Sequence, residues 1–320
     1  MNELGPVFIV GSYRSGTSVL TWCLGQHSNI LPLPETHWIA RLTIDMCQLY
    51  KYGTVHGRYT HIGALGWTEE DFFAAFGEKV NQFIVETREP RLNFIRQLNA
   101  EKKGLTEKQI LELEKEGNIS PDPDLVSADN YQIVRSPKDS KQRWVDGTPE
   151  NSAYIYGLSK LFPNAKFIHI LRNPNDVARS LMRFSRAGGG GVDYTEDEAF
   201  NCWTRLVESA INAELALGAE RIIRLEYEAF INSPEESLRK ALEFLGEDFS
   251  EDCLLPLNEK INSSKINDVE EYGSFSSLSW RKANDFYNEI RNTLPGSPDL
   301  EALKSLEVKF RNYVSSIHGK

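Results

Sequence analysis

A short apolar segment that leads directly into a glycine-bounded loop constrains this chain more than any other feature. Residues 6–10 are apolar and rich in β-branched side chains, which predicts a buried strand. The loop lies between Gly11 and Gly16, and apolar residues at helical spacing predict a helix over residues 17–27. A strand, a glycine loop and a helix in this order present backbone N–H groups and a helix N-terminus to one anion. The sequence therefore predicts an anion site at the end of the first strand.

The spacing of this loop nearly matches the phosphate-binding loop G-x-x-x-x-G-K-[ST]. Gly11 and Gly16 have the required separation, and Ser18 occupies the serine/threonine position. Thr17 replaces the lysine that would contact the β- and γ-phosphates of a nucleoside triphosphate. Arg14 is the cation inside the loop, so we expect a compact anion other than a triphosphate. The alternative is an ordinary tight turn between a strand and a helix.

A second candidate anion site follows the strand predicted at residues 166–171. Arg172 comes directly after this strand, Asn173 is a good N-cap, and Pro174 suits the first position of a helix. Ser180 lies seven residues after Asn173, about two helical turns on and so on the same face. Ligands of open α/β sheets bind at the carboxyl ends of the strands, where an arginine and a hydroxyl make a second anion site. The alternative is that Arg172 is a surface cation and Ser180 an inert helix serine, and for either residue taken alone this would be the better interpretation.

Strand candidates alternate with helices along the chain, with further strands at residues 144–146 and 221–225. This alternation predicts an α/β fold, a P-loop-like parallel β-sheet flanked by helices. We expect one domain over residues 1–320, with a helical insertion at about residues 51–140 that shows no nucleotide motif.

The segment between the first helix and the insertion contains candidate catalytic groups. Pro34 suits the first position of a helix, which places Glu35 in the first helical turn.

Residues 51–66 contain four glycines, which predicts an irregular loop. Thr68 is the predicted N-cap of a helix that runs to about Glu86.

Composition excludes several classes of protein. A net charge of −10 argues against nucleic-acid binding. The four cysteines are far apart and form no C-x-x-C pair, so a zinc site and a disulfide framework are not expected. No apolar run approaches the roughly 20 residues that span a bilayer, and no room remains for a signal peptide before the first strand. We therefore expect a cytoplasmic protein without an integral membrane segment.

The two anion motifs together resemble the sulfotransferases that use 3′-phosphoadenosine 5′-phosphosulfate (PAPS). The resemblance covers most of residues 6–46 and 144–265, and the loop has the Arg-Ser-Gly-Thr form of the tyrosylprotein and many bacterial branches. The segments that carry it are the 5′-phosphosulfate loop (11–18), the segment of the catalytic glutamate (33–37), the Thr-Pro segment (144–151), the 3′-phosphate motif (171–180) and the strand-Tyr-Glu segment (221–230).

The resemblance implies PAPS as cofactor, 3′,5′-adenosine bisphosphate as product, and a set of site residues. Catalytic roles fall on Glu35, Arg14 and His37. The implied cofactor contacts are Arg14, Ser15, Gly16, Thr17, Ser18, Arg172, Ser180, Tyr227 and Lys265.

The chain departs from the family pattern at some positions. Gly147 stands where many relatives have a lysine, so any role of that lysine is absent here. Arg183 and Arg186 follow Ser180, and neither aligns clearly with the family's additional phosphate-binding arginine. The dimer motif of the cytosolic branch is missing, which leaves the oligomeric state open.

Sulfuryl transfer needs positioning, a cation at the leaving oxygen and a base for the acceptor proton. The amides of residues 14–18 and the Arg14 side chain suit the leaving oxygen. Glu35 is the first candidate base and His37 the reserve. The competing interpretation of Glu35 is an acid that complements a helix dipole. No metal is expected.

Other functions remain open from the sequence. A P-loop-like kinase or NTPase with a degraded loop is one alternative, and a non-catalytic nucleotide-binding protein of the same fold is another. The expected partner is a hydroxyl acceptor, less readily an amine, either a small molecule or a group on a carrier or peptide. Aromatic residues such as Trp38 and Tyr50 hint at an apolar or sugar-like acceptor, although core packing explains them equally well.

Overall fold

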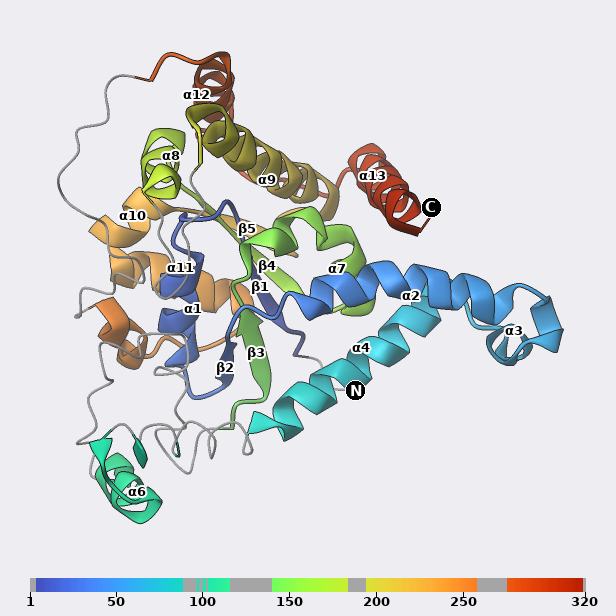
Figure 1. Ribbon diagram of the computed structural model, residues 1–320, viewed down its shortest axis with the longest axis horizontal. Helices are drawn as coiled ribbons and strands as arrows, with labels where there is room; N and C mark the ends of the chain where they lie inside the picture. The colour runs from blue at the N-terminus through green and yellow to red at the C-terminus, as the bar shows by residue number, and fades with distance from the viewer. Residues whose placement is uncertain are drawn as a thin grey trace.

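The computed structural model describes residues 4–88, 97, 100–101, 103–115, 140–183, 194–257 and 275–318. Its centre is a β-sheet covered by helices on both faces (Figure 1). The predicted α/β fold with a parallel, helix-flanked sheet is confirmed.

Five parallel strands form the sheet in the spatial order β2-β3-β1-β4-β5. They are β1 (Val7–Val10), β2 (Ile30–Leu33), β3 (Arg143–Asp146), β4 (Lys166–Leu171) and β5 (Ile222–Glu226). Four of these match predicted strands, and β2 is the one that the sequence analysis missed. It contains Pro32, which lacks a backbone donor, and its place at the edge of the sheet is where proline is tolerated. Because all strands are parallel, their carboxyl ends meet at one edge.

Both faces of the sheet are buried, which explains why the strands are apolar without alternation. Phe8 lies on the face that packs against α4, α7 and α9, with its ring centroid 5.3 Å from that of Trp144 and 5.5 Å from that of Phe167. Ile9 and Ile168 lie on the opposite face, which α1 and α11 cover.

The described helices alternate with the strands along the chain. The α-helices are α1 (Thr17–Gly25), α2 (Trp38–Thr54), α3 (His61–Leu65), α4 (Glu69–Glu86), α6 (Glu107–Lys115), α7 (Ile155–Leu161), α8 (Pro174–Met182), α9 (Glu196–Leu217), α10 (Tyr227–Asn232), α11 (Pro234–Leu245), α12 (Leu278–Ile290) and α13 (Leu300–His318). Short 3-10 helices are η1 (Gly57–Tyr59), η4 (Pro149–Ala153) and η5 (Glu251–Leu257). None of the helices in the described ranges is long and apolar enough to cross a membrane.

The predicted helix start at Pro34 is wrong, because α2 begins at Trp38. Tertiary hydrogen bonds hold the preceding loop instead. The Thr36 backbone N–H donates to Thr148 Oγ1 at 2.9 Å, and Thr36 Oγ1 donates to the Asp146 carboxylate at 2.7 Å. Glu35 therefore lies in a loop after β2, and the interpretation of Glu35 as a first-turn acid loses its basis.

The predicted irregular loop over residues 51–66 is also wrong. α2 continues to Thr54, and η1 and α3 occupy most of the remainder. Helix starts with a strong capping signal were predicted correctly. The Thr68 side chain accepts from the Asp71 N–H in a capping box, and the Asn173 side chain accepts from the Asn175 N–H.

Helix α4 lies in the predicted insertion, yet it packs into the main core. Phe72, Phe73 and Ile84 are buried in the same cluster as Phe8 of β1. The expectation of a single domain with an insertion at about residues 51–140 stays a prediction.

A buried ionic network ties β4 and β5 to α9. His169 Nδ1 lies 2.6 Å from Glu214 Oε1, and Arg224 Nε donates to the same oxygen at 2.9 Å. Arg224 Nη1 also donates to the carbonyl of Ile290, the last residue of α12, and to that of Thr293 just after this helix. Because each charge has partners, the network can be buried without a large penalty.

Candidate active site

The carboxyl ends of the strands meet at one edge of the sheet (Figure 1), and the described segments that contain candidate site residues follow the strands there. The loop that contains Arg14 follows β1, and Glu35 and His37 follow β2. Arg172 follows β4, and Tyr227 follows β5. Segments far apart in the chain therefore meet because the parallel sheet aligns their strand ends.

The loop between β1 and α1 has the backbone of an anion site. Gly11, Arg14 and Gly16 have φ angles of 148°, 61° and 96°. A Cβ at Gly11 would lie 2.5 Å from the carbonyl oxygen of Ile170, so only glycine fits there. Gly16 is the N-cap of α1 and provides no side-chain acceptor, which leaves the first N–H groups of this helix for a ligand.

Two hydroxyl groups of the loop support this interpretation. Ser12 Oγ and Ser15 Oγ are buried and have no hydrogen-bond partner among the residues that the structure describes. Buried hydroxyls in proteins normally have one. Thr17 and Ser18 follow these serines as the first two residues of α1. A phosphate or sulfate group fits this donor set.

The second predicted anion site lies directly against the loop. Arg172 Nη1 donates to the backbone carbonyl of Arg14 at 2.7 Å, and Arg14 Nε donates to Ser180 Oγ at 3.0 Å. Burial, followed by the charge of Arg172, lowers the pKa of the Arg14 guanidinium below its ordinary value. Two arginines held this close are stabilised by an anion between them. The structure thus brings Arg14 against both Arg172 and Ser180, whereas the sequence analysis placed Arg14 in the first site and Arg172 with Ser180 in the second.

Arg172 is held in place from several directions. Its guanidinium lies 4.2 Å from the ring centroid of Tyr227, and the Trp203 indole donates to its backbone carbonyl at 3.0 Å. The Nε atom of Arg172 is buried and has no hydrogen-bond partner within the described part of the chain. An anionic ligand would satisfy this donor.

Tyr227 also packs on the loop. A Cβ at Gly16 would lie 2.7 Å from the Tyr227 ring carbons Cδ2 and Cε2. The ring therefore needs a glycine at position 16. Tyr227, which the sequence analysis gave as a cofactor contact, thus packs against both Arg172 and the loop at Gly16.

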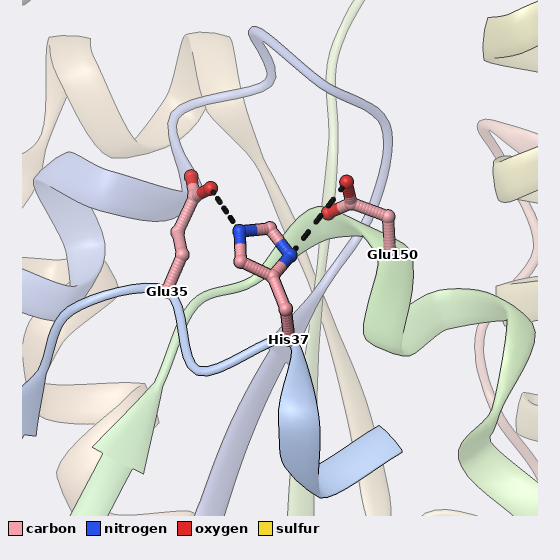
Figure 2. A group of neighbouring side chains, drawn as sticks. All are labelled: Glu35, His37 and Glu150. Atoms are coloured by element: carbon pink, nitrogen blue, oxygen red, sulfur yellow. Dashed lines mark ion pairs between the residues drawn. The ribbon is translucent and has the colours of Figure 1, made fainter. Parts of the chain in front are cut away.

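Glu35, His37 and Glu150 form a cluster of acid–base groups beside these sites (Figure 2). His37 Nε2 lies 3.4 Å from Glu35 Oε2, and His37 Nδ1 lies 3.9 Å from Glu150 Oε1. The side chains of His37 and Glu35 are 54% and 46% exposed, so a ligand can reach them from solvent. His37 has a φ of 46°, which turns the chain into α2 and directs the imidazole between the two carboxylates.

This cluster can serve two kinds of chemistry. An imidazole between two carboxylates can pass and hold a proton. Its ligand atoms all lie within 4.8 Å of one another, so the same groups could also hold a metal ion. Glu150 was not predicted from the sequence, because its place depends on the turn after β3. Tyr13 adds to the cluster, since burial and then a hydrogen bond with Glu150 raise the pKa of its phenol.

Asp146 organises the loops that carry the cluster, and sequence reasoning missed it as well. Its buried carboxylate accepts hydrogen bonds from the side chains of Thr36, Thr148 and Asn151 at 2.7, 2.6 and 2.9 Å. It also accepts from the Thr148 N–H at 2.9 Å. These bonds join the loop after β2 to the loop after β3. An aspartate two residues before Thr148, at the end of a strand, is the sequence signal that could have revealed it.

Gly147 lies too close to α1 for a larger residue. A Cβ at this position would lie 2.2 Å from Thr21 Oγ1 and 3.1 Å from the Thr17 carbonyl oxygen. Those atoms bond each other at 2.9 Å and are fixed in the helix. The lysine that resemblance would place here therefore has no room in this loop.

Some predicted site residues cannot be placed. Lys265 and Arg186 lie outside the described residues. Arg183 is described and is the C-cap residue of α8.

A parallel α/β sheet with two adjoining candidate anion sites and an acid–base cluster at its carboxyl edge has the arrangement in which open α/β proteins bind their ligands. The chain belongs to the sulfotransferase family, whose sequence profile matches residues 6–251. The resemblance noted in the sequence is thus confirmed at the level of the family.

Individual relatives match over shorter stretches of their own length. An uncharacterised protein of Aquifex aeolicus is 26% identical over 265 residues, which are 80% of this chain and 26% of that protein. Protein-tyrosine sulfotransferase 2 of Gallus gallus is 29% identical over 108 residues, 33% of this chain and 28% of that protein. The omega-hydroxy-beta-dihydromenaquinone-9 sulfotransferase Stf3 of Mycobacterium bovis is 31% identical over 116 residues, 34% of this chain and 29% of that protein.

Solved structures give weaker likenesses. The sulfotransferase domain from the curacin biosynthetic pathway superposes with a TM-score of 0.44 at 18% identity, covering 98% of this chain and 96% of that chain. Sulfotransferase STF9 from Mycobacterium avium has a TM-score of 0.41 at 15% identity, covering 99% of this chain and 77% of that chain.

Proposed function

We propose that this protein transfers a sulfuryl group from PAPS to a hydroxyl group of an acceptor. Membership of the sulfotransferase family supports sulfuryl transfer in general. The observation that carries the choice of donor is the direct connection between two anion sites. Arg172 bonds the main chain of the β1–α1 loop, and Arg14 of that loop bonds Ser180. A nucleotide with anionic groups on both its 5′ and 3′ positions suits two sites this close.

The two sequence motifs would each bind one anionic group of PAPS. We assign the amides of residues 14–18 and the Ser15 hydroxyl to the 5′-phosphosulfate. Arg172 and Ser180 hold the 3′-phosphate, and Tyr227 orients Arg172 through its ring. PAPS supplies the sulfuryl group and a phosphate leaving group when bound. Lys265 stays a predicted contact.

The chain's own residues perform positioning, charge stabilisation and proton transfer. Glu35 takes the acceptor proton as the acceptor oxygen bonds to sulfur and the sulfur–oxygen bond to the phosphate breaks. Loop amides and Arg14 stabilise the negative charge that develops on the leaving oxygen. His37 is the reserve base. Its contacts with Glu35 and Glu150 also suit it to holding Glu35 in position.

The acceptor class follows from the base and from the relatives. A carboxylate base suits a hydroxyl acceptor better than an amine, because an unprotonated amine attacks without losing a proton first. Two relatives are named for a protein tyrosine and for an omega-hydroxy menaquinone derivative, both hydroxyl compounds. The cytoplasmic location predicted from the sequence remains part of this proposal.

Two other functions are less well supported. A kinase or NTPase needs the loop lysine, and Thr17 occupies its position. A non-catalytic nucleotide-binding protein would have no use for the clustered Glu35, His37 and Glu150.

The test is a transfer assay with radiolabelled PAPS and a panel of phenols, long-chain alcohols and tyrosine peptides. We expect transfer to at least one hydroxyl acceptor, and a loss of about 10²–10⁴-fold in Glu35→Gln with nucleotide binding retained. Glu78→Gln, which changes an exposed glutamate of α4, is the control and should be fully active. Normal turnover in Glu35→Gln would move the role of base to His37, and ATP hydrolysis without sulfate transfer would contradict the proposal.

A further inference from the structure

A cavity of about 230 Å³ lies beside Glu35. Three elements make its walls: β2 with the loop that follows it, the first residue of α2, and the C-terminal end of α4. Glu35 lines it, so a molecule seated there would reach the candidate base directly.

The walls are mainly apolar. Leu31, Leu33 and Ile84 line the cavity and are at most 8% exposed. Glu35 and Arg88 are the charged residues among those that line it. Arg88 Nη1 donates to the Ser140 carbonyl at 2.7 Å, so part of its hydrogen-bonding capacity is used within the protein.

Two aromatic rings stand at the sides of this cavity. Trp38 and Phe83 are 44% and 56% exposed, so part of each ring surface is open to a ligand. Their ring centroids are 6.4 Å apart with an interplanar angle of 84°. This edge-to-face arrangement leaves ring surface for a third flat group, a contact that aromatic residues favour.

We propose that this cavity is the acceptor pocket and that it binds the ring of a phenol, with the hydroxyl directed to Glu35. The inference rests on the proposed function, because it takes Glu35 as the base. Ligand pockets usually measure about 300–1,000 Å³, so this one holds a single ring rather than a fused ring system. A larger acceptor would place only its phenolic end here.

The same walls disfavour a sugar. Most hydroxyl groups of a sugar would lie against Leu31, Leu33 and Phe83 without a hydrogen-bond partner. An unpaired buried hydroxyl costs more binding free energy than the apolar contact returns.

The test measures binding of 4-methylphenol by ligand-observed NMR in the presence of 3′,5′-adenosine bisphosphate, so that it does not depend on turnover. We expect saturable binding that weakens about tenfold in Trp38→Ala and in Phe83→Ala. Phe83 is exposed and lies on a different helix, so its variant remains informative if Trp38→Ala disturbs the start of α2. Tyr59→Ala is the matched control, because it removes an aromatic ring that is 81% exposed and does not line the cavity.

Unchanged affinity in both cavity variants would overturn the proposal, as would glucose binding as tightly as 4-methylphenol. A parallel thermal-shift measurement with the nucleotide separates this result from the proposed function. Stabilisation by the nucleotide without phenol binding would reject the pocket and leave sulfuryl transfer standing. Phenol binding without nucleotide stabilisation would instead count against the proposed donor.

Discussion

Arg14 links the two anion sites to the acid–base cluster. Its guanidinium bonds Ser180, and its charge interacts unfavourably with Arg172 and favourably with Glu35. A cation in this position can contribute to nucleotide binding and to the charge that develops during transfer. These two contributions are separable, because the product nucleotide lacks the transferring group.

We predict that Arg14→Ala lowers the transfer rate more than the affinity for 3′,5′-adenosine bisphosphate. Loss of a charge-assisted contact should weaken product binding by roughly tenfold, and loss of transition-state stabilisation should lower kcat by about 10²–10³-fold. Calorimetry and a transfer assay on one preparation give both values. Arg41→Ala, an exposed arginine paired with Asp45, is the control. Equal losses in rate and affinity would make Arg14 a binding residue alone.

At the level of secondary-structure elements, the β1–α1 loop needs glycine at positions 11 and 16, because Ile170 and Tyr227 lie too close for a Cβ there. Gly16 combines a φ of 96° with the ring of Tyr227 at 2.7 Å from any added Cβ. The β1–α1 loop and the start of α10 therefore pack closely against each other at Gly16 and Tyr227. Substitution should affect the anion sites through Tyr227 as well as through backbone strain.

We predict that Gly16→Ala destabilises the protein by about 1–3 kcal/mol and weakens binding of the product nucleotide, because Tyr227 must move. Gly66→Ala is a matched control. Gly66 has a φ of 66°, but nothing lies within 4 Å of an added Cβ, so this variant tests backbone strain alone. It should lose about 1 kcal/mol and bind nucleotide normally. Thermal unfolding with and without nucleotide measures both effects, and equal nucleotide affinity in the two variants would contradict the account.

The sequence predicted elements that have strong local signals. The run before Gly11, the Asn173-Pro174 helix start and the Thr68 cap are each specified by residues within a few positions. β2 and the loop at residues 34–37 were predicted wrongly or missed, because contacts with β3, Asp146 and Thr148 determine them. Tertiary hydrogen bonds outweighed the preference of Pro34 for a helix start.

The same distinction holds for the site. Arg14 could be predicted as a site residue from the glycine-bounded loop, and Arg172 and Ser180 from their spacing after the fourth strand. Glu150 could not, because it carries no signal until the sheet brings the ends of β2 and β3 together. Asp146 has only the weak local signal of an aspartate two residues before Thr148, and its bond to Thr36 depends on the fold.

At the scale of the whole molecule, the network of His169, Glu214 and Arg224 joins the sheet to α9 and to the chain after α12. Burial would raise the pKa of Glu214, but hydrogen bonds and charges from His169 and Arg224 outweigh it and lower the pKa below 4.5. A carboxylate whose pKa is lower in the folded state stabilises the fold above its unfolded pKa. This stabilisation is lost as pH falls through the folded-state pKa.

We predict that Glu214→Gln destabilises the protein by about 3–5 kcal/mol at pH 7, because it leaves the buried Arg224 guanidinium without its carboxylate. The difference from wild type should shrink as the pH falls below 4.5 and through the lower pKa of folded Glu214, because the wild-type side chain then becomes neutral as well. Urea unfolding at several pH values measures this. Glu301→Gln, which breaks an exposed pair with Lys304, should cost less than about 1 kcal/mol throughout. A gap between Glu214→Gln and wild type that does not change with pH would refute the assignment.

The central claim is that two adjoining anion sites select a nucleotide phosphorylated at both the 5′ and 3′ positions. The most direct measurement is the thermal shift produced by 3′,5′-adenosine bisphosphate, 5′-adenosine monophosphate and ATP with Mg²⁺, on wild type and Arg172→Ala. Arg179→Ala, an exposed arginine of the same helix α8, is the control. We predict that the bisphosphate stabilises wild type and Arg179→Ala far more than the other two nucleotides do. In Arg172→Ala this advantage should fall by about 1.5–3 kcal/mol of binding free energy. Equal shifts from the bisphosphate and the monophosphate in wild type, or a larger shift from ATP, would contradict the account.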